Sequence, residues 1–287
     1  MGRNTYGGQI NRPVLPTADT GSSYSGIWQM DEHYGLRRDG ALSGNRAPYG
    51  LPYLSTTVFH LVPGTANDTN LIDGTGNHQI YQASDQPNDG GEYLNPTTPL
   101  GCYYTDKTYK YGPTSVRINP SSSFTVLYTN KLDLSTGDWT IEWWEYRETT
   151  GVGVIVGWGL PGVYYAIMCG YYSAGVGNRL YISTTGTSWT VNGLLFGTSS
   201  LNQWTHYAAT RNTTNSAIYV HQNGYLRGTA TLNNTTAIKW PYGNLTICPA
   251  YPTYTADNTF GGYIEDLCIS KRAKYNNTNF TPTRIIE

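Results

Sequence analysis

Carboxylates are the first groups in this sequence whose type and spacing could do chemistry. Glu142, Glu145 and Glu148 follow one another at intervals of three, and Glu265 and Asp266 are adjacent. Retaining glycoside hydrolysis needs two carboxyl groups about 5–5.5 Å apart. Side chains share a strand face only at even spacings, so Glu142 and Glu145 should lie on opposite faces, with Glu148 in the following turn. Glu265 and Asp266 should divide in the same way. We therefore expect no catalytic residues and no enzyme activity.

Histidines and cysteines show no catalytic or metal-binding spacing either. The five histidines are scattered: His33, His60, His78, His206 and His221. Zinc sites use closely spaced Cys and His pairs, and many serine hydrolases carry Gly-x-Ser-x-Gly; the sequence has neither. The four cysteines are far apart and form no CxxC pair, which favours free buried thiols.

The composition indicates an all-β protein with polar aromatic surfaces. The 287 residues include 26 Tyr, 8 Trp and 33 Gly, and strands favour Tyr, Trp and Thr while turns favour Gly and Asn. Charged residues make up 13% and the net charge is −1. Binding to a phosphate backbone needs a concentrated basic patch, so we expect no nucleic-acid partner. We also expect no membrane insertion and no secretion signal, because the sequence has neither a long apolar run nor a signal-peptide start.

Aromatic residues in Gly- and Pro-rich segments are the candidate binding residues. Sugars stack their C–H faces on Tyr and Trp rings. Six aromatics fit this role: Trp158, Tyr164, Tyr171, Trp189, Trp240 and Tyr242. The alternative is that they pack on the sheets or against neighbouring subunits, because Tyr and Trp also dominate protein interfaces.

The first 52 residues differ from the rest. A Pro-containing extended arm precedes Ile27, Met30 and Tyr34, whose spacing of i, i+3, i+7 predicts one face of a short helix that also carries Trp28. One short helix cannot form its own core, so it should dock elsewhere. We predict an anchoring arm over residues 1–52, with Ile27, Trp28, Met30 and Tyr34 as its contacts, and a second unit over 53–287. The arm could instead pack on its own domain.

Strand motifs follow in a fixed order within the second unit. They occupy residues 111–118, 136–144, 201–211, 217–226 and 262–271. Asn223-Gly224 between two β-prone runs predicts a hairpin, because both turn positions need positive φ. Together the motifs resemble the laminin-G-like, concanavalin A-like jelly roll. The resemblance implies two antiparallel sheets packed face to face, with Trp139, Trp143 and Trp204 in the core and His206 as a structural residue.

Calcium is the one metal that the sequence leaves open, and we expect no other cofactor. Laminin-G-like domains often hold Ca²⁺ at a rim of the sandwich through carboxylates and carbonyls, which are the oxygen donors that this ion prefers. Asp73, Asp89 and Asp138 lie in turn-forming segments and are the candidates. Alternatively, Asp138 ends a turn before its strand.

The C-terminal segment narrows the resemblance further. Residues 275–282, with Tyr followed by Asn-Phe-Thr-Pro, are similar to those of jelly-roll domains in bacteriophage virion structural proteins. The implied function is a fibre, adhesin or decoration protein on the virion surface, made in the host cytoplasm. It would contact other virion proteins through the arm, form a homo-oligomer and bind host-surface polysaccharide. A decoration or cement protein without a ligand is the alternative, and a polysaccharide-degrading enzyme ranks third.

Overall fold

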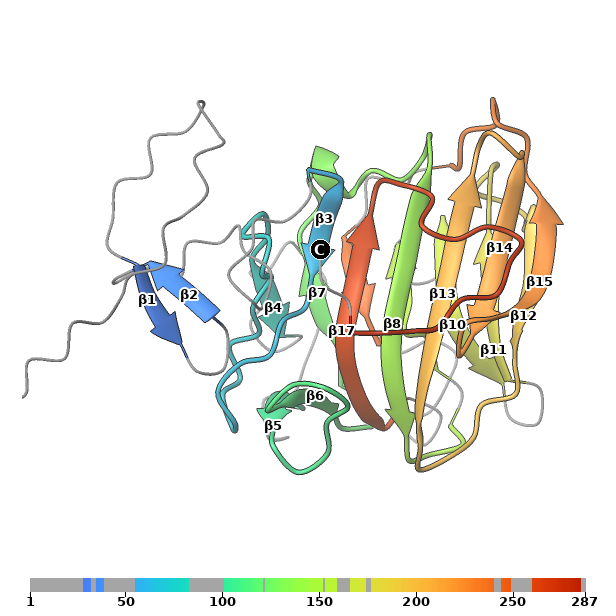
Figure 1. Cartoon of the computed structure of the whole chain (residues 1–287). Coiled ribbons are helices and arrows are strands. Elements are labelled where there is room, and N and C mark those ends of the chain that lie inside the picture. Colours follow the sequence, from blue (N-terminus) through green and yellow to red (C-terminus); the bar gives the residue numbers. More distant parts are fainter. Residues whose placement is uncertain are drawn as a thin grey trace, which may run out of the picture.

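Most of the described strands belong to two antiparallel sheets packed face to face (Figure 1). The computed structural model describes residues 28–31, 35–38, 55–82, 101–120, 122–151, 153–158, 166–173, 177–239, 244–248 and 260–284. The elements of this part are strands apart from one short 3₁₀ turn, η2 (Asn130–Leu132). The predicted all-β jelly-roll sandwich is therefore confirmed.

The larger sheet has eight strands, and β17 occupies its middle. In spatial order they are β15 (Tyr225–Thr231), β14 (Ala217–Gln222), β13 (Trp204–Asn212), β8 (Trp139–Arg147), β17 (Gly262–Ser270), β6 (Ser115–Ile118) and β5 (Cys102–Thr105). The eighth strand, β3 (Thr57–His60), pairs with the far end of β17. The last strand of the chain is thus flanked by β8 on one side and by β3 and β6 on the other.

The second sheet has seven strands. In spatial order they are β12 (Val191–Gly197), β11 (Gly177–Ile182), β10 (Ile167–Ser173), β9 (Val156–Trp158), β16 (Leu245–Ile247), β7 (Phe124–Val126) and β4 (Ile80–Gln82). Neighbouring strands along this order pair antiparallel.

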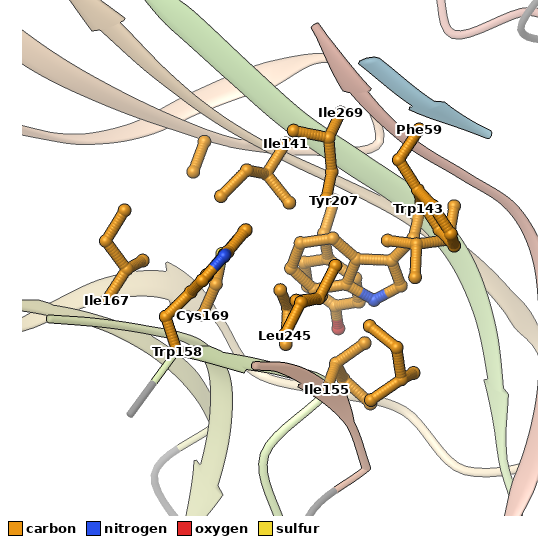
Figure 2. Packing of buried hydrophobic residues seen from close by; sticks show 14 of the residues in the cluster. Phe59, Ile141, Trp143, Ile155, Trp158, Ile167, Cys169, Tyr207, Leu245 and Ile269 are labelled. Carbon is orange, nitrogen blue, oxygen red and sulfur yellow. The ribbon is translucent and has the colours of Figure 1, made fainter. Parts of the chain in front are cut away.

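Buried side chains from both sheets form the core between them (Figure 2). Trp143 stacks on Tyr207 with ring centroids 5.4 Å apart, and Phe196 meets both rings edge-on at 5.7 Å. Trp139 and Trp143 are fully buried, as predicted. Trp204 is only partly buried, so its prediction as a core residue was wrong. It pairs in register with Tyr146 and so lies on the other face of the sheet.

The predicted hairpin at residues 223–224 is present. Asn223 and Gly224 have φ of 50° and 76°, and they join β14 to β15. The four cysteines are buried thiols outside any disulfide, as expected. No helix in the described ranges is long and apolar enough to cross a membrane.

The predicted N-terminal helix is wrong. Strands β1 (Trp28–Asp31) and β2 (Gly35–Arg38) form an antiparallel pair there. Trp28 and Met30 alternate with polar residues, which is the period of a strand, whereas the helical spacing depended on Ile27 and Tyr34. Those two residues lie outside the described residues, and the anchoring role and the boundary at residue 52 stay predictions.

The chain after β17 crosses the outer face of the larger sheet, over β8, β13 and β14 (Figure 1). We call residues 271–284 the C-terminal strap. Phe280 donates its backbone N–H to the carbonyl of Gly224 at 2.9 Å and stacks on Tyr275 with centroids 3.8 Å apart. Asn279 accepts a hydrogen bond from the N–H of Leu226 at 3.0 Å. These contacts fasten the strap to the hairpin.

Candidate functional site

The carboxylates of β8 face opposite sides of the larger sheet, as predicted. Glu142 points outward, where the strap covers it: Lys274 donates to one carboxylate oxygen and the Tyr275 hydroxyl donates to the other at 2.7 Å. His206 lies 3.4 Å away. Burial alone would raise the pKa of Glu142, but the charge of Lys274 and the contact with His206 lower it to about 2. This carboxylate is therefore a buried anion held by its partners.

Glu145 points inward and is equally occupied. Its carboxylate accepts hydrogen bonds from Trp143 Nε1 at 3.1 Å, from Arg147 Nε at 3.2 Å and from Asn178 Nδ2 at 3.1 Å. Ser199 adds a fourth at 3.3 Å. Such a network satisfies a buried charge. Glu142 and Glu145 thus share no cleft, and Glu148 follows β8 and pairs with Arg117.

Two of the three calcium candidates, Asp73 and Asp138, accept hydrogen bonds in the described structure. The two oxygens of Asp73 accept backbone N–H groups from His60, Thr75, Asn77 and His78, at 3.0–3.2 Å. Hydrogen bonds from its own turn and from β3 thus occupy this buried carboxylate, and its role as a calcium ligand stays a prediction.

Asp138 accepts the backbone N–H and hydroxyl of Thr213, at 2.7 and 2.6 Å. It therefore precedes its strand as a turn residue, which was the alternative. Asp89 lies outside the described residues. Across the residues that the structure describes, no group of three His, Cys, Asp or Glu side chains could hold a metal.

Trp158 is a core residue, which corrects its prediction as a stacking platform. It ends β9, is fully buried and lies among Ile167, Cys169 and Leu245 between the sheets (Figure 2). The Gly-rich sequence that follows suggested a loop, but the strand continues through Trp158, since it pairs with both Ile167 and Leu245.

Trp189 lies on the outer face of the seven-stranded sheet, next to Tyr181. The two rings are tilted, with centroids 5.2 Å apart, and Val154 and Met168 pack beneath them. Tyr181 reaches this face because β11 alternates: Leu180 enters the core while its neighbours stay partly exposed. We call Arg179, Tyr181 and Trp189 the aromatic face.

Polar groups surround the aromatic face. Arg179 donates from Nη1 to the Tyr181 hydroxyl at 3.4 Å, and its Nε has no hydrogen-bond partner among the described residues. A Cβ on Gly193 would lie 3.2 Å from that hydroxyl, so glycine keeps the approach open. Hydroxyls of the adjoining turn bond to one another, as Thr184 and Thr190 do at 2.6 Å. An apolar platform with a guanidinium and hydroxyls suits a sugar ring.

Of the other four predicted aromatics, only Tyr171 lies within the described residues, and there only its backbone is described. Tyr171 is paired in register with Arg179, so its backbone belongs to the same region of the sheet. Tyr164, Trp240 and Tyr242 lie outside the described residues. Sequence reasoning missed Arg179 and Tyr181. Their signal was the alternation of residues 178–182, which places every second side chain outward.

Comparison with known families identifies the architecture. The family model described as the concanavalin A-like lectin/glucanases superfamily matches residues 121–276, which is more than half of the chain. The chain belongs to this superfamily. Comparison with curated proteins finds no match.

Solved structures with the same fold include domains whose names state a bound sugar. The binding domain of Paraclostridial Mosquitocidal Protein 1 has a TM-score of 0.56 and 14% identity over 77% of this chain and 50% of its own. Domain 4 of AbnA, an extracellular arabinanase of Geobacillus stearothermophilus, in complex with arabinotriose, has a TM-score of 0.52 and 19% identity. That match covers 76% of this chain and 93% of the AbnA domain. The ligand binding domain of botulinum neurotoxin serotype D, in complex with N-acetylneuraminic acid, has a TM-score of 0.53 and 12% identity. That match covers 77% of this chain and 48% of the toxin domain. This chain spans about half the length of the two toxin domains.

Proposed function

We propose that this protein is a bacteriophage virion component that displays a lectin-like sandwich and binds host-surface glycan through the aromatic face. The observation that carries the proposal is the Tyr181–Trp189 pair on an outer sheet face, with Arg179 beside it. The sequence similarity of residues 275–282 to phage virion proteins supports the location on a particle. The N-terminal segment would attach the protein, and the sandwich would face outward.

Two physical arguments support glycan as the ligand. Aromatic rings offer a large apolar contact at small conformational cost, while guanidinium and hydroxyl groups hold the sugar's oxygens. One such site binds weakly, but many copies on a symmetric particle raise the effective concentration for each further contact. The arabinanase domain and the toxin domain, which share this fold, are named in complex with a sugar, and this supports glycan as the ligand class.

The test is binding of the purified protein to host cells and to their extracted polysaccharide. Trp189→Ala should weaken binding at least about tenfold, which corresponds to about 1.4 kcal/mol. Tyr225→Ala is the matched control, because Tyr225 is the most exposed of the described large aromatics, at 58%, and belongs to the edge strand of the other sheet. Equal binding by the two variants would reject the aromatic face as the site.

A decoration or cement role without a ligand is the second candidate. Leu195 on β12 is 39% exposed, Tyr225 on β15 is 58% exposed, and these two strands are the adjoining edges of the two sheets. Exposed strand edges with apolar side chains suit subunit contacts. Particles assembled with Leu195→Lys should then lose the protein or become heat-sensitive, whereas the glycan hypothesis leaves incorporation unchanged.

We propose binding without catalysis. Both β8 carboxylates are occupied by buried partners on opposite sides of a sheet, which supports this part of the proposal. Incubation of host polysaccharide with the protein should release no new reducing ends. Release that is abolished by Glu145→Gln would reverse the conclusion.

A further inference from the structure

A second exposed aromatic cluster lies on the larger sheet, in the loop that joins β5 to β6. Tyr109 is 49% exposed and Tyr111 is 37% exposed, and Lys107 and Lys110 are exposed beside them. We call residues 106–114 the Tyr-Lys loop. The aromatic face belongs to the other sheet, so the two surfaces are separate.

Buried contacts fix the Tyr-Lys loop to the sheet. The carboxylate of Glu265 on β17 accepts the backbone N–H groups of Lys110, Tyr111 and Gly112 at 2.5, 2.9 and 2.7 Å. The Ser115 hydroxyl donates to the carbonyl of Thr108 at 2.5 Å. A loop held in one conformation loses little entropy when it binds a ligand.

Two exposed side chains of the Tyr-Lys loop also contact a buried ring. Tyr111 meets the buried Trp144 ring edge-on, with centroids 5.3 Å apart and an interplanar angle of 80°. The ammonium of Lys110 lies 4.7 Å from the centroid of Trp144 and 5.5 Å from that of Tyr111. Cation–π contacts of this kind hold the charge beside the tyrosine.

The exposed side chains of the Tyr-Lys loop carry more positive than negative charge. Lys107 and Lys110 are both exposed. Arg284 of the strap also reaches the loop, where it donates to the carbonyl of Tyr111 at 3.4 Å. Asp106 is the exposed carboxylate of the loop, and Glu265 is buried and occupied by the backbone. The exposed balance is therefore positive in a chain of net charge −1.

We infer that the Tyr-Lys loop is a second binding site, for an acidic polysaccharide that carries carboxylates on its sugar rings. The rings would stack on Tyr109 and Tyr111, while Lys107 and Lys110 pair with the carboxylates. A nucleic acid fits less well, because the two lysines of the loop form no track for a phosphate backbone. The inference does not rest on the aromatic face or on a phage origin.

The experiment measures binding of the full chain to polygalacturonate, with neutral dextran of matched length as the comparison. Tyr109→Ala and Lys110→Gln should each weaken polygalacturonate binding by about three- to fivefold, which is the effect of one exposed ring or cation. Tyr225→Ala is the matched control, since Tyr225 is an exposed ring with Arg227 5.8 Å from its centroid. It should stay within about twofold of the wild type.

Each outcome decides the inference. Trp189→Ala, on the other sheet, should lose less polygalacturonate affinity than Tyr109→Ala, so the two sites are distinguished. No wild-type binding, equal affinity for dextran, or an equal loss in Tyr225→Ala would overturn the inference. Tighter binding to single-stranded DNA than to polygalacturonate would also overturn it, in favour of a general polyanion surface. Melting temperatures equal to wild type confirm that each variant is folded.

Discussion

Removal of Lys274 tests whether the strap is held by a buried charge pair. Glu142 is buried and the Lys274 side chain is 13% exposed, and Tyr275 and His206 complete the set around the carboxylate. Lys274→Met would leave Glu142 as a buried anion without its cation. Breaking a buried pair in this way costs about 3–5 kcal/mol. We therefore expect the free energy of unfolding at pH 7 to fall by that amount.

The assay is urea unfolding followed by tryptophan fluorescence. Glu148→Gln is the matched control, because it removes the partner of Arg117 from a partly exposed pair and should cost about 0–1 kcal/mol. The double variant Glu142→Gln with Lys274→Met should recover part of the loss, since no uncompensated charge remains. If Lys274→Met costs no more than Glu148→Gln, the pair does not hold the strap and the reasoning is refuted.

Three further predictions concern acid, the hairpin and the thiols. The folded pKa of Glu142 is lowered to about 2 from 4.5, so its stabilisation of the fold is complete above pH 4.5 and is lost as the pH falls toward 2. Urea unfolding at a series of pH values should show the free energy of unfolding falling by about 3 kcal/mol over this range. A free energy that does not change with pH would contradict the prediction. Gly224→Ala should lower the free energy of unfolding by more than about 2 kcal/mol and expose the strap to proteases, because its Cβ would lie 1.9 Å from the Phe280 carbonyl oxygen. Gly137 also has a left-handed backbone but open space around it, so Gly137→Ala should lower the free energy of unfolding by only about 1 kcal/mol. Equal losses in the two variants would show that the strap does not dock at Gly224. Burial raises the pKa of Cys102 to about 12, so native protein should not react with a thiol reagent that labels it in urea, and rapid native labelling would show that the core opens.

The sequence predicted the parts of the fold that local patterns encode. Asn223-Gly224 set a hairpin because both positions need positive φ, and alternation around Trp143 separated Glu142 from Glu145. The same rule, applied from Trp204, shows that this residue lies on the outer face with His206.

What failed depends on contacts between distant residues. Trp158 precedes a Gly-rich segment, and only its pairing with β10 and β16 shows that it is core. The carboxylate of Asp73 accepts the backbone N–H of His60, which lies 13 residues earlier, and no local pattern indicates this contact. The Tyr-Lys loop depends on Glu265, which lies more than 150 residues later and gives no local signal.

The central position of β17 has a consequence for synthesis. Until residues 262–270 have left the ribosome, β8 has an unpaired edge in the middle of the larger sheet, and Glu142 has no cation beside it. Pairing between segments this far apart is slow, and unpaired edges associate with other chains. The nascent chain therefore cannot close its sandwich in stages from the N-terminus, and chains that stop before β17 should be recovered as aggregates.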